Sequence, residues 1–353
     1  MLNISNFLPI KCTASDTRLS EEDLIDIYVA EGIGKEGDLV LVEALEDAGA
    51  YCEVENMQGR SMRIFKGQRF VGVLGNRESS KNIVGGIDEG GIKIDETAII
   101  SLLTNGGIVG TCYDSPTYMG DAMKLKCIGL LKKENKTINT LDKLKDAPTQ
   151  VEKIPPIILV AGTATDAGKT TIASKVISYL ANQGYTVAGT KLAGTGCLED
   201  VLAHKDAGAT YVMDFPDAGL PSTYTSESNY QPGIRLLLQN LANKKPDFIV
   251  AELGGDIIWA NIPTLFKMSD IMEFTSSLLL VSSDAISTIA AYKLLEEWGF
   301  NKDTYVFNSP FKNNLASQRR LQKYLNIDSY DSTKIQDVHS VVKEIVHQNK
   351  ISV

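Results

Sequence analysis

Six short apolar runs alternate with helical patterns across the second half of the chain, and this alternation constrains the fold more than any other feature. The runs begin at residues 157, 186, 210, 248, 278 and 304, and each is followed by a stretch with apolar residues at helical spacing. Continuous apolar strands joined by amphipathic helices are typical of a parallel sheet covered on both faces, with right-handed crossovers. We therefore expect a doubly wound α/β domain, closed by a surface helix over Ser332–Asn349.

The first part of the chain has a different pattern. Short β-type runs separated by glycine turns predict a smaller β-rich domain over residues 1–131. Two helices are expected within it, over Ser20–Ala30, which starts with a capping-box pattern, and over Asp95–Thr104. Residues 132–153 are polar and lysine-rich and form the expected linker, so the α/β domain is predicted to occupy residues 154–353.

The composition is that of a soluble globular protein. The chain has 353 residues, of which 43% are hydrophobic and 22% charged, a length that suggests about two domains. The 44 acidic residues outnumber the 35 basic ones, and the net charge of -9 opposes binding to nucleic acid or to an anionic membrane. Five scattered cysteines without a C-x-x-C pair are typical of reduced thiols, and the N-terminus lacks the pattern of a secretion signal. We expect a cytoplasmic protein.

The most specific motif directly follows the first of the apolar runs. Residues 162–171 read G-T-A-T-D-A-G-K-T-T, a variant of G-x-x-x-x-G-K-[ST] with one additional residue between its glycines. Such a loop lets backbone N–H groups surround a phosphate at a helix N-terminus, while the lysine reaches the terminal phosphates and the hydroxyl binds Mg²⁺. We therefore predict a P-loop that binds ATP and Mg²⁺. The predicted nucleotide-binding residues of the loop are Gly162, Thr163, Thr165, Asp166, Ala167, Gly168, Lys169, Thr170 and Thr171.

Charged residues stand at the ends of two further apolar runs. Lys191 ends the second run, and Glu252 and Asp256 lie at the end of the fourth. Open α/β sheets bind ligands at the carboxyl ends of their strands, so Lys191 is predicted to face the phosphates, with a solvated surface lysine as the alternative. A carboxylate after the fourth strand would hold Mg²⁺ or its water. We favour Glu252 over Asp256 as the metal-binding residue beside Thr170, and Lys169 and Lys191 as the catalytic residues.

Other polar residues near the same strand ends have two possible roles, in ligand binding or in local backbone structure. Asp200, Asp206, Asp214 and Asp217 are candidates for binding the metal or the substrate, but helix capping and turn formation explain them equally well. Asn308 ends the sixth run and is predicted to pair with the purine of ATP, with turn formation as the alternative. The three histidines have no metal-ligand spacing, and neither G-x-S-x-G nor H-E-x-x-H occurs.

These motifs resemble the dethiobiotin synthetase branch of P-loop proteins, which is related to cobyrinic acid diamide synthases and MinD-like ATPases. The loop of that family, G-T-D-T-x-x-G-K-T, is similar to Gly162–Thr170 except at Ala164. Its second lysine, in G-Y-K-P-V-x-x-G, is similar to Lys191, and its E-G-A-G-G is similar to the segment from Glu252 to Gly255.

The resemblance implies an enzyme that phosphorylates a carbamate formed from a substrate amine and CO₂. In this chain Lys191 would then contact the carbamate, and Asn308 would read adenine. The family has no N-terminal β domain. A more distant resemblance is to a bacterial P-loop family linked to D-amino-acid N-acylation, which pairs a separate N-terminal domain with such a loop and has an Asp-Phe pair like Asp214-Phe215.

We consider three functions for this chain. The favoured one is a Mg-ATP-dependent ligase or kinase-like enzyme, in which phosphoryl transfer activates a carboxylate or carbamate of a small molecule. The alternatives are a nucleotide-switch or assembly ATPase with a protein partner, and an N-acyltransferase whose loop holds the phosphates of acyl-CoA. MinD-like loops carry an additional lysine after the first glycine, where this chain has Thr163, and this disfavours the switch. We expect a small-molecule substrate as the partner, and a homodimer is left open.

Overall fold

The computed structural model describes residues 1–311 and 313–349, and the chain divides into two compact units. Unit 1 contains Met1–Asp146 together with two later segments, Thr195–Glu199 and Phe215–Asn229. Unit 2 contains the other described residues. The sequence patterns did not indicate that later segments belong to the first unit. The predicted domain boundaries, with residues 132–153 as a linker, concern parts of the chain that fold independently. They stay a prediction.

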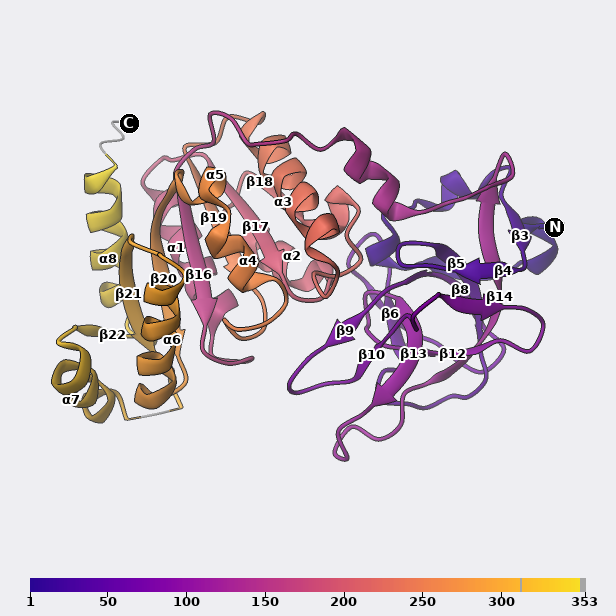
Figure 1. Ribbon diagram of the computed structural model, residues 1–353, viewed down its shortest axis with the longest axis horizontal. Coiled ribbons are helices and arrows are strands. Elements are labelled where there is room, and N and C mark those ends of the chain that lie inside the picture. Colours follow the sequence, from indigo (N-terminus) through magenta and orange to yellow (C-terminus); the bar gives the residue numbers. More distant parts are fainter. Residues whose placement is uncertain (312, 350–353) are drawn as a thin grey trace. The chain divides into compact units, whose positions relative to one another are not determined.

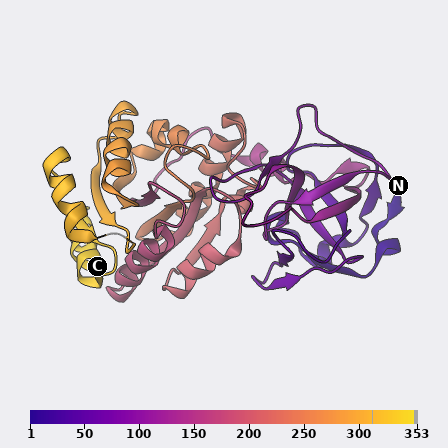
Figure 2. The same cartoon turned by 90° about the horizontal axis from the view of Figure 1, so that it is seen from below.

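Residues 1–146 are β-rich, as the sequence patterns predict, and their described elements are strands and 3-10 helices without an α-helix (Figures 1 and 2). The strands are β1 (Leu2–Asn3), β2 (Ile10–Thr13), β3 (Tyr28–Ala30), β4 (Gly32–Gly34), β5 (Leu39–Ala44), β6 (Glu53–Glu55), β7 (Ser61–Arg63), β8 (Arg69–Leu74), β9 (Arg77–Glu78), β10 (Val84–Gly86), β11 (Ile92–Ile94), β12 (Ile99–Leu102), β13 (Ile108–Asp114), β14 (Lys124–Lys133) and β15 (Lys136–Thr137). The 3-10 helices are η1 (Ile4–Phe7), η2 (Ser15–Thr17), η3 (Glu21–Leu24) and η4 (Thr140–Asp146).

The main sheet of unit 1 has apolar side chains on both faces. Its strands run in the order β1-β3-β14-β5-β8-β13-β10-β9, with mostly antiparallel pairing. Successive side chains of a strand point to opposite faces. In β5, Leu39 and Leu41 therefore join one hydrophobic cluster, and Val40 and Val42 join the other. This explains why β5 is a continuous apolar run rather than an alternating one.

Two helices predicted in this region are wrong. Ser20 does begin a capping box, since Asp23 accepts hydrogen bonds from its backbone N–H and hydroxyl, but only the short η3 follows. The chain then pairs with β14 as β3, because strand pairing outweighs a local helix signal. The second predicted helix is β12, whose residues alternate between exposure at Ile99 and burial at Ile100, the period of a strand.

Specific contacts explain why two later segments belong to unit 1. In the first, the Leu198 N–H and the Cys197 thiol donate to the two carboxylate oxygens of Glu55, at 2.7 and 3.2 Å. In the second, which includes η5 (Phe215–Ala218), the Arg18 guanidinium pairs with Asp217 at 2.7 Å. Asp217, one of the open candidates for metal or substrate binding, therefore has an ion-pair partner within unit 1.

Unit 2 contains a seven-stranded parallel sheet in the order β18-β17-β19-β16-β20-β21-β22, which confirms the predicted doubly wound α/β fold. The strands are β16 (Ile157–Gly162), β17 (Val187–Ala193), β18 (Tyr211–Asp214), β19 (Phe248–Leu253), β20 (Thr275–Ser282), β21 (Asp303–Asn308) and β22 (Ser329–Asp331). The helices are α1 (Lys169–Asn182), α2 (Leu198–Asp206), α3 (Glu227–Ala242), α4 (Ile262–Lys267), α5 (Ser269–Met272), α6 (Ala285–Glu297), α7 (Asn314–Leu325) and α8 (Ile335–Gln348). The first residues of α2 and α3 are counted with unit 1.

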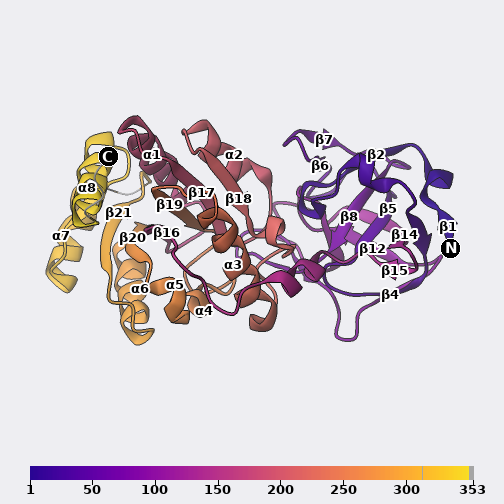
Figure 3. The same cartoon turned by 90° about the horizontal axis from the view of Figure 1, so that it is seen from above.

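Helices cover both faces of this sheet. Figure 3 shows α1, α2 and α8 on one side of the strands and α3, α4, α5 and α6 on the other. α1 packs against β16, β17, β19 and α8, and its buried Ile177 and Leu180 share one hydrophobic cluster with Val341 and Val342 of α8. The predicted closing helix is thus α8, and it completes the core beside α1. None of the helices in the described residues combines the length and the apolar character needed to cross a membrane.

Ile177 tests this packing. The substitution Ile177→Ala should lower the free energy of unfolding by about 2–5 kcal/mol, because it leaves a cavity under a side chain with no exposed surface. Denaturant-induced unfolding measures the effect. Ile286→Ala removes a side chain that is 81% exposed and should change stability by about 0.5 kcal/mol or less. Equal effects of the two substitutions would contradict the described core.

Candidate functional site

The glycine-rich loop joins β16 to the first turn of α1. Gly168 stands immediately before α1 with φ of 107°, a left-handed conformation that a residue with a Cβ rarely adopts. Asp166 also has a positive φ, of 61°. No side chain caps α1, whose first turn therefore offers its backbone N–H groups to an anion. The local backbone is thus that of a phosphate-binding loop.

Lys169 folds back across this loop. Its side chain is nearly buried, and Nζ donates to the carbonyl oxygen of Ala164 at 2.9 Å. A Cβ on Gly162 would lie 2.9 Å from Lys169 Cδ, so the first glycine of the motif leaves room for the lysine stem. Burial lowers the pKa of Lys169, and the nearby carboxylate of Glu252 only partly offsets this effect. A bound polyanion would provide this buried ammonium with the negative charge it lacks.

Oxygen atoms from three elements meet at Thr170. Its hydroxyl lies 2.9 Å from Glu252 Oε1 and 3.3 Å from Asp200 Oδ1. Glu252 is 3% exposed, and its second oxygen, Oε2, is buried without a hydrogen-bond partner among the described residues. The sequence predicts Thr170 and Glu252 as the metal-binding residues, and the structure brings their side chains together. It adds Asp200, which was only one of several open candidates.

These oxygens suit Mg²⁺. Within the described residues there is no group of three or more His, Cys, Asp or Glu side chains that could hold a metal ion by itself. Mg²⁺ rarely needs such a cage, because it is usually bound by one or two carboxylates together with phosphates and water. Thr170 and Glu252 supply hard oxygen donors beside the loop, and Glu252 Oε2 is an acceptor that lacks a partner. The residues present therefore fit a magnesium ion that accompanies a phosphate chain.

Lys191 is the second cation of the site. It lies in β17 in register with Glu252 of β19 and Asp214 of β18, and it is 7% exposed. Its Nζ lies 2.5 Å from Asp200 Oδ2. A Cβ on Gly254 would come within 2.9 Å of Lys191 Cε and 2.6 Å of a β17 backbone oxygen, so the glycine after β19 is required by close approach. Lys191 is buried, unlike the solvated surface lysine that was the alternative.

Charge complementarity stabilises this arrangement. Burial raises the pKa of Asp200, but the adjacent ammonium of Lys191 and weaker contributions from neighbouring groups, including the Thr170 hydroxyl, together hold that pKa below its ordinary value. Asp200 therefore stays ionised near neutral pH and balances Lys191. Lys191 also contributes to lowering the pKa of Lys169, since two cations disfavour each other. Both lysines belong to one electrostatic cluster.

His204 is a site residue that the sequence reasoning missed. It lies one helical turn after Asp200 on α2, so both side chains project from the same face of that helix. His204 is fully buried, and its Nε2 lies 3.4 Å from Glu252 Oε2. The four-residue spacing is visible in the sequence, but it matches no metal-binding motif, so the sequence alone does not single out His204. Since α1 and α2 cover the same face of the sheet (Figure 3), α2 brings both residues to the strand ends.

The side chains of three predicted nucleotide-binding residues of the loop have surroundings that do not point to a phosphate contact. The Thr163 hydroxyl lies 2.9 Å from Ser283 Oγ and accepts from the Ser283 N–H, while its own N–H donates to Val281. These contacts tie the loop to the segment after β20. Ala167 is buried in the hydrophobic cluster under α1, and Thr171 is exposed on α1. Their side chains therefore support the loop or lie outside it.

The remaining candidates do not join the cluster through the contacts described. Asn308 is nearly buried, and its amide nitrogen donates to Asn314 and Ser329. Asp256 accepts from the Ile258 N–H, as a turn residue would. Thr165 is half buried, and Asp206 is exposed at the end of α2. Nucleotide binding by Thr165 and metal or substrate binding by Asp206 stay predictions.

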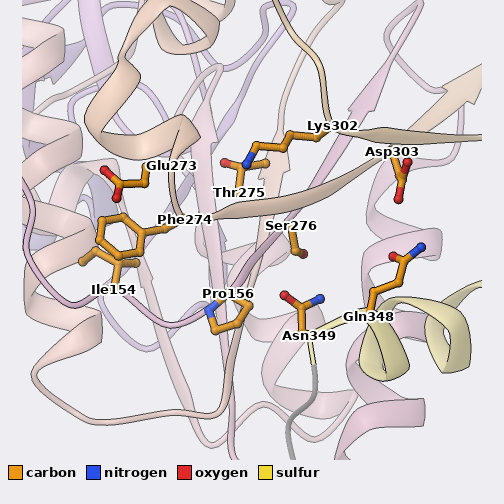
Figure 4. Close-up of a pocket in the computed structure, with 10 residues that line it drawn as sticks. All are labelled: Ile154, Pro156, Glu273, Phe274, Thr275, Ser276, Lys302, Asp303, Gln348 and Asn349. Carbon is orange, nitrogen blue, oxygen red and sulfur yellow. The ribbon is translucent and has the colours of Figure 1, made fainter.

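A separate pocket lies at the opposite ends of the strands. Figure 4 shows it at the starts of β20 and β21 and the end of α8, lined by Ile154, Pro156, Glu273, Phe274, Thr275, Ser276, Lys302, Asp303, Gln348 and Asn349. None of the predicted site residues lines it. Parallel α/β sheets bind ligands at the carboxyl ends of their strands, so the glycine-rich loop is the better candidate.

Lys169 tests the phosphate-binding role of the loop. The substitution Lys169→Met keeps most of the buried stem but removes the charge, and we expect it to abolish detectable Mg-ATP binding in calorimetric titration without loss of thermal stability. Lys175→Met is the matched control on α1, because Lys175 contacts the Ser332 carbonyl rather than the loop. Wild-type ATP affinity in the Lys169 variant would show that the loop does not bind phosphate.

Comparison with known proteins agrees with this geometry at the level of the family. No curated protein matches the chain in sequence. Among solved structures, the chain is similar to the signal recognition particle receptor FtsY from Elizabethkingia anophelis, with 14% identity, a TM-score of 0.39 and coverage of 60% of this chain and 75% of that one. It is also similar to a ParA family ATPase from Chlorobium tepidum TLS, with 12% identity, a TM-score of 0.34 and coverage of 57% and 94%. Scores this low carry no information about function.

The family model is more informative. It describes the CobQ/CobB/MinD/ParA nucleotide binding domain and matches residues 158–350, more than half of the chain. The matched region includes the glycine-rich loop, both lysines, Glu252 and the whole of α2. The chain therefore belongs to the CobQ/CobB/MinD/ParA family of P-loop nucleotide-binding proteins.

Proposed function

We propose that this protein is a Mg-ATP-dependent ligase or kinase-like enzyme, which transfers the γ-phosphoryl group of ATP to a carboxylate or carbamate of a small molecule. Family membership supports nucleotide binding and leaves the reaction open. The observation that carries the finer proposal is Lys191, a second buried cation, which pairs with Asp200 and lies close enough to the loop lysine to lower its pKa. The similarity of Lys191 and its neighbours to the second-lysine motif of dethiobiotin synthetases agrees with this role.

The energetics of burial favour a functional role for Lys191. A buried ion pair is weak support for stability, since well-packed apolar residues of similar size often stabilise a protein equally well or by about 1–4 kcal/mol more. The Lys191–Asp200 pair needs another reason to be kept beside a phosphate-binding loop. Phosphoryl transfer to an anion supplies one, because two negatively charged reactants must approach each other. A lysine between them lowers that repulsion most in the transition state.

Each residue then has a defined task. The loop N–H groups and Lys169 bind the β- and γ-phosphates, and Lys191 binds the anionic acceptor. An acceptor oxygen forms a bond to the γ-phosphorus while the bond to the β-γ bridging oxygen breaks, and ADP leaves with that electron pair. A neutral amine then forms a bond to the activated carbonyl carbon and loses a proton to solvent, while the bond from that carbon to the phosphate oxygen breaks and inorganic phosphate leaves with the electron pair. Bound Mg²⁺, held by Thr170 and Glu252, would neutralise charge on the phosphates.

Lys191 distinguishes this proposal from its alternatives. The substitution Lys191→Met should leave ATP affinity nearly unchanged and lower substrate-stimulated ADP release by about 10²–10³-fold, the usual scale for losing one preorganised electrostatic contact. The assay follows ADP with panels of amino acids and small carboxylic acids, with and without bicarbonate and acyl-CoA. Lys205→Met is the matched control, because Lys205 is an exposed lysine on α2.

Two results would contradict the ligase proposal. If no small molecule stimulates ADP release and a protein partner stimulates the wild type and the Lys191 variant equally, the protein is a nucleotide switch. If acyl-CoA binds to the loop in competition with ATP and an amine is acylated without ADP release, the protein is an N-acyltransferase.

The purine contact is a separate prediction. Asn308 Oδ1 is buried and has no hydrogen-bond partner in the described part of the chain, while its amide nitrogen is already engaged. An acceptor of this kind suits the 6-amino group of adenine but not the carbonyl of guanine. We therefore expect ATP to bind more tightly than GTP by on the order of 1–3 kcal/mol. Purine riboside triphosphate, which lacks the 6-amino group, should bind as weakly as GTP, whereas equal affinity for all three would refute the contact.

A further inference from the structure

His204 is a buried polar side chain whose hydrogen-bonding capacity is unused. It is fully buried on α2, and both ring nitrogens lack a hydrogen-bond partner among the described residues. Such groups are rare in folded proteins, because burial without a partner costs about 1–3 kcal/mol. The nearest acidic atom is Glu252 Oε2, at 3.4 Å from Nε2, and it also lacks a partner. Two buried polar atoms, His204 Nε2 and Glu252 Oε2, therefore lie close together, and each lacks a hydrogen-bond partner among the described residues.

The backbone beneath His204 is built to admit its ring. A Cβ on Gly189 of β17 would lie 2.7 Å from His204 Cβ and 3.1 Å from His204 Cγ. Any larger residue at position 189 would push the ring away from the sheet. α2 also fixes the direction of the side chain, because Asp200, one turn earlier, is held by Lys191. The placement of the imidazole against Glu252 is thus determined on two sides.

We propose that His204 is a positioning residue for the metal-binding carboxylate: its Nε2–H donates to Glu252 Oε2 and keeps Oε1 directed at the Thr170 hydroxyl. The proposal rests on the proposed function, in which Thr170 and Glu252 hold Mg²⁺. Carboxylates that bind metals are themselves hydrogen-bonded by neighbouring groups, which orient them. The present separation of 3.4 Å exceeds a well-formed N–H···O bond by a few tenths of an ångström, so a small shift of either side chain completes the bond.

A direct role of His204 as a ligand is less consistent with its position. Mg²⁺ prefers oxygen ligands, and the nitrogen that would bind it faces a carboxylate oxygen instead. The positioning role also assigns one task to each of the two polar residues of α2 at the site. Asp200 orients Lys191 on the acceptor side, and His204 orients Glu252 on the metal side. The helix α2 then orients both the acceptor-binding lysine and the metal-binding carboxylate.

The test measures metal affinity rather than turnover. His204→Leu removes both nitrogens, His204→Gln places an amide nitrogen near Nε2, and His204→Asn places one near Nδ1. Mn²⁺ binding to the ATP-bound protein is followed by electron paramagnetic resonance, and metal-free ATP binding by calorimetry. We expect the Leu and Asn variants to bind Mn²⁺ about 10–100-fold more weakly than wild type, the usual effect of losing such a partner. The Gln variant should stay within about threefold of wild type, and metal-free ATP affinity should be unchanged in all three.

The outcomes separate this proposal from the one on which it rests. If wild-type protein with ATP does not bind Mn²⁺ at the site, the metal role of Glu252 fails and the positioning role fails with it. If the wild type binds Mn²⁺ and the folded Leu variant binds it equally well, only the positioning role is wrong. If the Leu variant does not fold, the Gln and Asn variants decide, because a purely structural histidine would give no difference between them in metal affinity.

Discussion

The hydrogen bond between the Thr170 hydroxyl and Glu252 Oε1 is the contact on which the arrangement of the site depends. Thr170 lies in the first turn of α1, and Glu252 lies in β19. Because β16 pairs directly with β19, the strand that ends in the loop lies beside the strand that supplies the carboxylate. The strand order thus fixes the distance between the loop and the carboxylate before any ligand binds. A different order would separate them by a strand width of about 4.8 Å or more.

Around this contact the protein keeps an unusual amount of buried charge. Two ammonium groups and two carboxylates, those of Lys169, Lys191, Asp200 and Glu252, interact in one cluster. Each is stabilised mainly by the others, because water is largely excluded and an isolated buried charge is strongly unfavourable. Preorganised charge of this kind does not have to rearrange when negative charge develops on a phosphoryl group. The free protein therefore already holds the buried charges that the proposed phosphoryl transfer would use.

The sequence predicted the position of those candidate site residues that lie at strand ends. The loop, Lys191 and Glu252 each lie at the end of an apolar run, so period and position were enough. His204 was missed because its partner Glu252 lies far along the chain, and only the fold brings the two side chains together. The same limitation applies to Glu55, whose contact with the start of α2 assigns a later segment to unit 1.

Local signals also failed where tertiary pairing decided the structure. The capping box at Ser20 gave a short 3-10 helix rather than an α-helix, since the following residues pair with β14. The strand β22 was not predicted, because Ser329–Asp331 is short and polar and is defined by its pairing with β21. In both cases the deciding contacts come from residues distant in sequence.

A structure of the protein with Mg²⁺ and a non-hydrolysable ATP analogue would show where the γ-phosphate lies relative to Lys169 and Lys191. We expect Lys169 to bind the γ-phosphate, Thr170 and Glu252 to contact Mg²⁺, and Lys191 to face the side of the γ-phosphate from which an acceptor would approach. Lys169 would then have exchanged the Ala164 carbonyl for phosphate oxygens. A γ-phosphate whose open side is turned away from Lys191 would contradict this arrangement.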